Sequence, residues 1–297
     1  MAKAKNRKRS NKPQKRRGQY GEIAHRFLQN KGAVIGMIIV IILIITAITC
    51  PLFLDYRDDV TRNSIPNRML PPSAEHWFGT DDLGRDIFNR VIWGSRYSLS
   101  IGITSMIISL VIGVFWGALA GYYTNTVFEM VIMRIADIMS ALPSILLGLV
   151  IVAAFGRSTT NVVIACSIMY IAPFMRVSRA SVLTVTGQEF VEASRAVGNS
   201  EFRTLFTHVL PNALSPIIVE ATLDVAGTIL CVSALSFLGL GIPSPAPEWG
   251  GMLSGARQFI MTNPHFMLPG FAILITVMSF NLMGDGLRDA LDPKQKK

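Results

Sequence analysis

Long apolar stretches alternate with short polar segments along most of the chain. Six stretches read as membrane spans, at 33–54, 99–122, 131–155, 160–175, 213–240 and 266–284. A helix needs about 20 residues to cross the hydrocarbon core of a bilayer, and five of the six stretches reach that length. The stretch 160–175 is short, although the Arg176 side chain that follows can extend it by snorkelling. The pattern predicts an all-α membrane protein with six transmembrane helices.

The composition agrees with this interpretation and adds a strong charge asymmetry. Hydrophobic residues make up 51% of the chain and charged residues 16%, with a net charge of +9. Residues 1–32 contain 11 Lys and Arg but one acid, Glu22. Such a tail is typical of a topology signal that stays in the cytosol. Contact with anionic lipid is a second interpretation, and nucleic-acid binding is a third, although no folded nucleic-acid module is visible.

The charge balance also predicts an orientation. Six spans with the N-terminus inside place both ends of the chain in the cytosol. The cytosolic segments then carry 19 Lys and Arg against 8 in the external segments, as the positive-inside rule requires. We therefore expect a basic cytosolic tail at 1–32, an anchor helix with an external segment at 33–98, and a core of five spans at 99–297. The core includes a cytosolic loop at 176–212.

This loop carries the most distinctive motif of the chain. It reads QEFVEASRAVG at 188–198 and HVLP at 208–211. Thr186 and Glu189 have the spacing of a capping box, and apolar positions from 190 to 197 fall on one helical face. Gly198 suits the left-handed position that ends a helix. A second apolar repeat runs from 202 to 209, and Pro211 should break it.

The loop therefore predicts two short helices joined at a glycine, each too short to be stable alone in water. Glu192 and Arg195, three residues apart, can pair on the polar side. One interpretation is a helical hairpin that packs on its own membrane domain. The other is a docking surface for a partner protein.

Four ionisable residues lie inside the predicted spans, where charges are costly and often functional. Arg134 and Asp137 are three apart near the inner end of the third span, and we expect them to pair. Glu220 and Asp224 share one face of the fifth span. Two acids on one face repel each other, so this face should look onto water, a cation or a sister subunit. They are candidates for a translocation path, unless they lie nearer the inner interface.

The external segments carry further patterns. A helix capped by Thr80 or Asp81 is expected to present Leu83 and Ile87 on one face and to lie on the outer surface. The loop 239–253 is rich in glycine and proline and should be rigid. In the second span, glycines at 113, 117 and 121 have the spacing that allows close helix contact.

The sequence contains no motif for catalysis. Three cysteines lie in apolar spans and are expected to be small buried hydrophobes, and the four histidines lack metal-ligand spacing. No GxxxxGK[ST] phosphate loop occurs anywhere in the chain. We expect no catalytic residue, no metal and no bound cofactor, so energy must come from another subunit or from an ion gradient.

Four motifs together resemble the C-type permease of dipeptide and oligopeptide ABC importers, over about residues 20–297. They are the EAA-like loop with its later Leu-Pro, the FGTD…GRD run at 78–86, the GIP…EWG loop at 241–250 and the GDGLRDALDP ending at 284–293. Ser194 and His208 replace the alanine and isoleucine that are usual in the loop. The resemblance implies a type I ABC-importer permease bundle with a cytosolic coupling helix. It assigns ATPase docking to Phe190, Glu192, Ala193, Ser194, Gly198, Phe202, Leu210 and Pro211.

The resemblance also implies partners and a location. The partners are a second homologous permease, two ATPase domains that use ATP and Mg²⁺, an extracytoplasmic substrate-binding protein and membrane lipid. The location is the bacterial cytoplasmic membrane, and the expected cargo is a di- or oligopeptide. A nickel chelate, glutathione or an oligosaccharide is the alternative cargo within the family. An ion-coupled secondary carrier is a rival class, but it would usually show an internal repeat, and none is visible between the halves.

Overall fold

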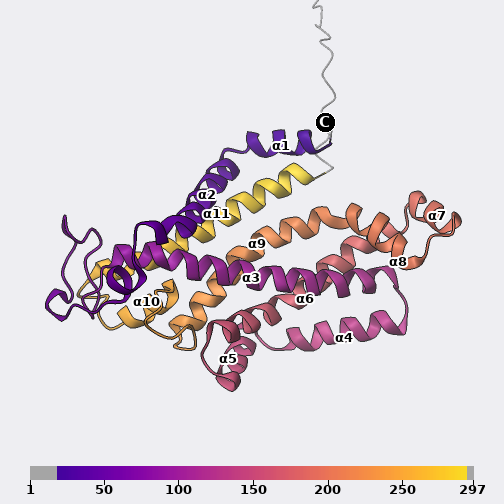
Figure 1. The fold of residues 1–297 in the computed structure, drawn as a ribbon. Coiled ribbons are helices and arrows are strands. Elements are labelled where there is room, and N and C mark those ends of the chain that lie inside the picture. Colours follow the sequence, from indigo (N-terminus) through magenta and orange to yellow (C-terminus); the bar gives the residue numbers. More distant parts are fainter. Residues whose placement is uncertain (1–18, 293–297) are drawn as a thin grey trace, which may run out of the picture.

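The computed structural model describes residues 19–292, which are mainly helical and contain no β-strand (Figure 1). The long helices are α2 (Lys31–Thr49), α3 (Ile87–Tyr122), α4 (Val127–Ala141), α5 (Ser144–Phe155), α6 (Thr159–Thr186), α9 (Leu210–Phe237) and α11 (Leu268–Leu291). The short helices are α1 (Gln19–Gln29), α7 (Glu189–Ala196), α8 (Glu201–Arg203) and α10 (Trp249–Ala256). Further 3₁₀ turns are Cys50–Leu52, Ile65–Asn67 and Pro264–Met267, and π-helical turns are Tyr56–Thr61 and Thr204–Val209.

Five helices in the described residues are long and apolar enough to cross a membrane, and α4 with α5 supplies a sixth crossing if this bent pair counts as one span. The predicted six spans are met when the pair counts as one span, and this third span is then broken and not straight. Its two helices meet at 84°. Leu142 is extended at the break, with ψ of 141°, because the ring of Pro143 disfavours a helical residue before it. Pro143 also lacks the N–H that would continue the ladder of α4.

Two other boundaries differ from the sequence-based expectation. The fourth span is longer than 160–175, because α6 continues for 28 residues through Pro173. The predicted outer helix at Thr80 or Asp81 does not form. Residues 80–86 make a turn in which the Asp81 carboxylate accepts from the backbone N–H groups of Leu83 and Arg85, both at 2.9 Å. Helix α3 begins only at Ile87 and then continues without a break, so the expected domain boundary at 98/99 lies within it.

The glycine stripe of the second span packs against α6, as its spacing predicts. A Cβ added to Gly113, Gly117 or Gly121 would lie 2.3–2.8 Å from a backbone carbonyl oxygen of α6. Such distances are shorter than van der Waals contact, so only glycine allows the two backbones to approach this closely. The pair α3 and α6 forms the centre of the bundle, with α9 beside it.

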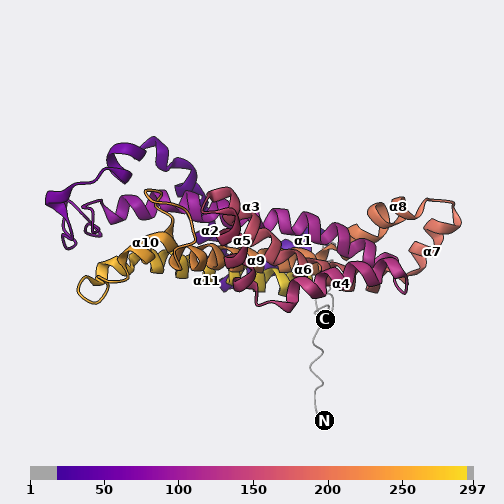
Figure 2. The ribbon, with the colours of Figure 1, turned by 90° about the horizontal axis from the view of Figure 1, so that it is seen from below.

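The bundle is elongated, and its loops gather at two opposite ends (Figures 1 and 2). Helices α7 and α8 form one end, while α10 and the segment from 50 to 86 form the other. Helix α1 lies against the last turns of α11, where Asn30 Nδ2 donates to Asp289 Oδ2 at 3.4 Å. Both ends of the described chain thus lie toward the half of the bundle that carries α7. This agrees with the expectation that the ends and the loop share one side of the membrane, and the side itself stays a prediction.

The rigid outer loop is anchored by Glu248 and Trp249, which are both 1% exposed. The Glu248 carboxylate caps α10 by accepting from the N–H groups of Gly250 and Gly251, at 2.9 and 2.8 Å. Burial raises the pKa of this carboxyl group. The Trp249 indole N–H donates to the carbonyl of Val91 at 2.9 Å. The loop is therefore fixed to α3 and is not a free flap.

Candidate functional site

The loop between α6 and α9 forms one tip of the molecule (Figure 1). Helix α7 ends there in a Schellman motif, with Gly198 N–H donating to Arg195 O at 2.9 Å and Asn199 N–H to Ser194 O at 3.3 Å. Gly198 has φ of +88°, as the sequence predicts for this position. The expected capping box is wrong, because the Thr186 hydroxyl donates back to Leu183 O within α6. Residue Gln188 precedes α7 without a side-chain cap.

The inner face of α7 packs on its own membrane domain. Val191, Leu205 and Val209 are fully buried, in one cluster with side chains of α3 and α6. Ser194 is also buried, and its hydroxyl lies 3.1 Å from the hydroxyl of Thr204. The prediction that Ser194 contacts a partner is therefore wrong, since it faces inward. In a weakly apolar helix the sequence pattern does not decide which face packs on the bundle. In α7 the face with Val191 is buried.

The segment after Gly198 does not form a separate helix. Helix α8 passes through the π-helical turn Thr204–Val209 into α9, so that Glu201–Phe237 is one continuous unit of 37 residues. Pro211 does not break it, contrary to our expectation. The Leu210 N–H bonds to Leu205 O, five residues back, and this wider turn leaves room for a proline without a donor. Leu210 packs against the buried cluster, whereas Pro211 is exposed.

The outer face of the loop is apolar and open, and we call it the tip surface. Its members are all exposed; they are Phe190, Glu192, Ala193, Val197 and Phe202. Phe190 is 39% exposed, Val197 84% and Phe202 60%. The Phe202 ring rests on Phe206, with centroids 4.5 Å apart. Exposed apolar side chains gathered at one tip are typical of an interaction surface.

A polar clip ties the tip surface to the bundle. Arg195 Nε lies 3.4 Å from Glu201 Oε2 and 3.3 Å from the Tyr122 hydroxyl, which itself donates to the Glu201 carboxylate. The guanidinium also lies over the Tyr122 ring, 5.1 Å from its centroid. Its hydrogen bond with the Tyr122 hydroxyl raises the pKa of Arg195. The expected pair of Arg195 with Glu192 is wrong. Glu192 is exposed, and Arg195 instead bonds Tyr122 of α3, which lies far away in the sequence.

The charged residues of the third span pair differently from our prediction. Asp137 accepts from Arg176 of α6, with Nη2 and Oδ1 3.2 Å apart, and not from Arg134. The packing of α4 on α6 brings Arg176 within reach, whereas Arg134 is exposed and has no ion pair in residues 19–292. A second pair, between Glu129 and Arg179, joins the same two helices. These pairs fix the broken span to the centre of the bundle.

Glu220 and Asp224 are both half-buried on α9. The Asp224 Oδ2 atom is buried and has no hydrogen-bond partner in the described part of the chain. The Tyr170 hydroxyl lies against α9 one turn away, where a Cβ on Gly227 would be 2.5 Å from it. A buried acceptor without a donor is costly, so this carboxyl group is available to a partner. Its place on a translocation path stays a prediction.

The sequence matches two family descriptions. Residues 113–297 match "Binding-protein-dependent transport system inner membrane component", and residues 18–72 match "N-terminal TM domain of oligopeptide transport permease C". The chain therefore belongs to the binding-protein-dependent transport permeases, the multi-pass inner-membrane subunits of ABC importers. The predicted resemblance to C-type permeases is confirmed.

Several relatives are similar over nearly their whole length. "Dipeptide transport system permease protein DppC" of Alkalihalophilus pseudofirmus is 49% identical, over 90% of this chain and 88% of the relative. "Oligopeptide transport system permease protein OppC" of Bacillus subtilis is 41% identical, over 92% and 88%. "Glutathione transport system permease protein GsiD" of Pectobacterium atrosepticum is 41% identical, over 94% and 93%.

The fold has a solved counterpart. A chain of the inward-facing MetNI methionine ABC transporter superposes with a TM-score of 0.57 over 69% of this chain and 96% of that chain, at 18% identity. This likeness confirms the predicted fold, an all-α permease bundle of the type I ABC importers.

Proposed function

We propose that this chain is a permease subunit of an ATP-driven importer that moves di- and oligopeptides across the bacterial cytoplasmic membrane. The tip surface carries the proposal, because a free loop has no evident reason to expose two phenylalanines and a valine to water. The printed functions of the relatives DppC and OppC support peptide as the cargo. The chain itself binds no cofactor and hydrolyses nothing. Its contribution is a conformational change.

The proposed assembly contains a second homologous permease, two ATPase domains that use ATP and Mg²⁺, and an extracytoplasmic substrate-binding protein. The tip surface docks on an ATPase domain, so α7 and both chain termini are cytosolic. The far end, with α10 and the segment from 50 to 86, then meets the binding protein outside.

The connections of the tip surface support a mechanical role. The Arg195 clip and the buried Val191 fix α7 to α3 and α8. Because α8 continues into α9 as one helix, a displacement at the tip moves the inner half of α9 directly. Asp224 lies on that same helix, where it faces the solute path in this proposal. The ATPase cycle thus shifts the bundle between its inward-open and outward-open states.

Glutathione is the second candidate cargo, because GsiD relatives are also about as similar as OppC. Reconstitution of the complex with its ATPases and binding protein in vesicles separates the candidates. Uptake of labelled di- and oligopeptides that requires internal Mg²⁺ and ATP is the expected result. Uptake driven by an ion gradient without ATP contradicts the proposal. Uptake of glutathione but of no simple peptide would identify glutathione, and not peptide, as the cargo.

A further inference from the structure

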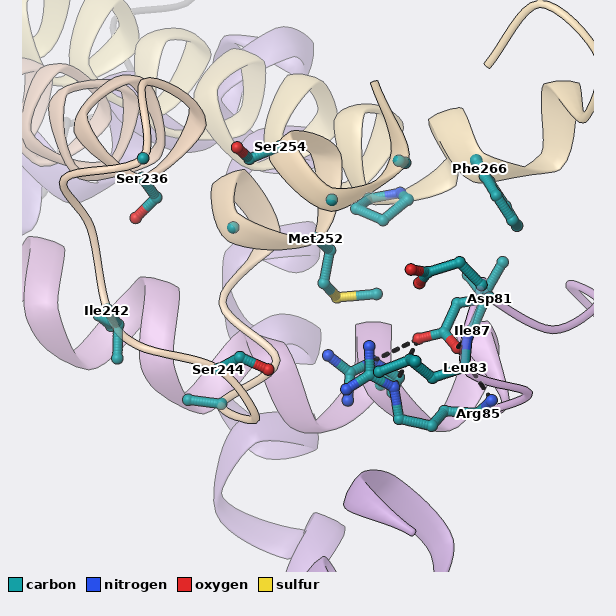
Figure 3. Close-up of a pocket in the computed structure, with 18 of the residues that line it drawn as sticks. Asp81, Leu83, Arg85, Ile87, Ser236, Ile242, Ser244, Met252, Ser254 and Phe266 are labelled. Carbon is teal, nitrogen blue, oxygen red and sulfur yellow. Dashed lines mark hydrogen bonds and ion pairs between the residues drawn. The ribbon is translucent and has the colours of Figure 1, made fainter. Parts of the chain in front are cut away.

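A pocket of about 250 Å³ is lined by residues of α10, at the end of the bundle opposite the tip surface (Figure 1), and Figure 3 shows it in close-up. Several parts of the chain converge on it. The turn before α3 contributes Asp81 and Arg85, the outer loop contributes Ser244, and α10 contributes Met252. Arg157, between α5 and α6, lies on its lining as well. The proposed orientation places this outer pocket outside the membrane.

The pocket is lined by three arginines and two aspartates, and one aspartate is already saturated. Asp81 Oδ2 accepts from Arg85 Nε at 2.7 Å and lies 3.5 Å from Arg90 Nε. Its other oxygen accepts two backbone N–H groups. Asp81 therefore orders the pocket wall but has little capacity left for a ligand.

The two arginines of this wall are buried and both pair with Asp81, but Arg85 keeps unused donors. Arg85 is 9% and Arg90 4% exposed. Arg90 is largely used within the chain: its Nη1 donates to the carbonyls of Val60 at 2.8 Å and Pro245 at 3.4 Å, and its buried Nε forms the 3.5 Å ion pair with Asp81. The terminal nitrogens of Arg85 make no hydrogen bond within residues 19–292. A buried guanidinium with spare terminal donors, as at Arg85, favours a carboxylate, which accepts two parallel hydrogen bonds.

The remaining two charged residues of the lining are Asp82 and Arg157. Within residues 19–292, neither the Asp82 carboxylate nor the Arg157 guanidinium forms a hydrogen bond or an ion pair. The pocket thus offers one acid without an ion pair, Asp82, one arginine without an ion pair, Arg157, and the terminal nitrogens of Arg85, which make no hydrogen bond within residues 19–292. Ile87, Ile242 and Phe266 add apolar walls between them. A ligand that matches this lining carries one cation, one anion and a small apolar body.

We propose that the outer pocket binds a short zwitterionic peptide, with its carboxylate at the arginines and its ammonium group at Asp82. The volume is below the roughly 300 Å³ at which drug-sized sites begin, which suits a dipeptide or the end of a longer peptide. The inference rests on the proposed function, to which it adds a peptide site on the permease itself. An acidic segment of the binding protein is the competing occupant.

Equilibrium binding of radiolabelled Ala-Phe to the purified permease–ATPase complex, without binding protein, tests the proposal. The complex should bind Ala-Phe more tightly than its C-terminal amide or its N-acetyl form. Arg157→Gln should weaken Ala-Phe binding about ten-fold and abolish the preference for the free carboxylate. Asp82→Asn should abolish the preference for the free amine. Both side chains lack partners within residues 19–292, so neither change should disturb the fold.

Arg62→Gln is the matched control, because Arg62 is an exposed arginine of the same end and lies outside the pocket lining. Its binding should equal that of the unchanged complex. Absence of Ala-Phe binding overturns the inference, as does an equal loss for the acid and the amide. In a separate titration with the binding protein, a loss of its affinity in Arg157→Gln and Asp82→Asn that leaves Ala-Phe binding unchanged overturns the inference and assigns the pocket to that partner. ATP-dependent peptide uptake, measured in parallel, reports on the proposed function separately.

Discussion

Replacing Phe202 with alanine should weaken docking of the ATPase by about 5- to 30-fold. Full burial of a phenylalanine side chain is worth about 1.5–3 kcal/mol. Phe202 is 60% exposed in this chain, so a partner can cover roughly three-fifths of it. This leaves about 1–2 kcal/mol for the contact, which corresponds to the stated loss of affinity. The remaining part of the ring rests on Phe206, and the variant should therefore fold and insert normally.

The assay is titration of the purified ATPase onto the permease pair in nanodiscs, with thermal unfolding of the permease measured in parallel. Phe155→Ala is the control, since Phe155 is 75% exposed but lies at the end of α5, away from the tip surface. The control should bind the ATPase normally. Unchanged affinity of Phe202→Ala, or the same loss in Phe155→Ala, refutes the assignment of the tip surface.

Three further predictions concern the clip, the α9 acid and the orientation. Tyr122→Phe removes the hydroxyl that bonds Arg195, at a cost of about 0.5–1.5 kcal/mol. ATPase binding should persist, while the amount of peptide imported per ATP hydrolysed should fall several-fold. An unchanged ratio would show that the polar clip has no part in coupling. Asp224→Asn should lower the uptake rate at least several-fold without reducing the amount of inserted protein, whereas normal uptake leaves Asp224 a structural role. Single cysteines at Glu192 and Ser244, both exposed, should be labelled by impermeant maleimide from the cytosolic and external sides respectively, and reversed labelling contradicts the topology.

Features that depend on local sequence were predictable. The apolar stretches predict the spans because a helix of about 20 apolar residues matches the thickness of the hydrocarbon core. Gly198 is recognisable because a helix that ends in a left-handed residue favours glycine over all others. The glycines at 113, 117 and 121 predict a close helix contact, although the spacing alone cannot name α6 as the partner.

Features that depend on distant contacts were not predictable. Arg134 is the nearest basic residue to Asp137 in the sequence, but the packing of α4 on α6 places Arg176 beside Asp137. Ser194 belongs to a helix with few apolar residues, so its periodicity could not decide which face is buried, and the fit of Val191 into the bundle decides it. Pro143 marks a kink in the third apolar stretch, but the sequence does not give its angle of 84°.

The Gly198→Val variant tests the central claim, that α7 docks on the ATPase and couples it to the bundle. A Cβ at this position would meet no atom within 4 Å, so its effect comes from the backbone, whose φ of +88° a β-branched residue strongly disfavours. The strain should open the Schellman turn and displace the tip surface, while the spans stay inserted. Co-purification of the ATPase and ATP-driven peptide uptake should then both be lost, with normal levels of protein in the membrane. Normal ATPase binding with uptake at the unchanged rate would show that this loop is not the coupling element.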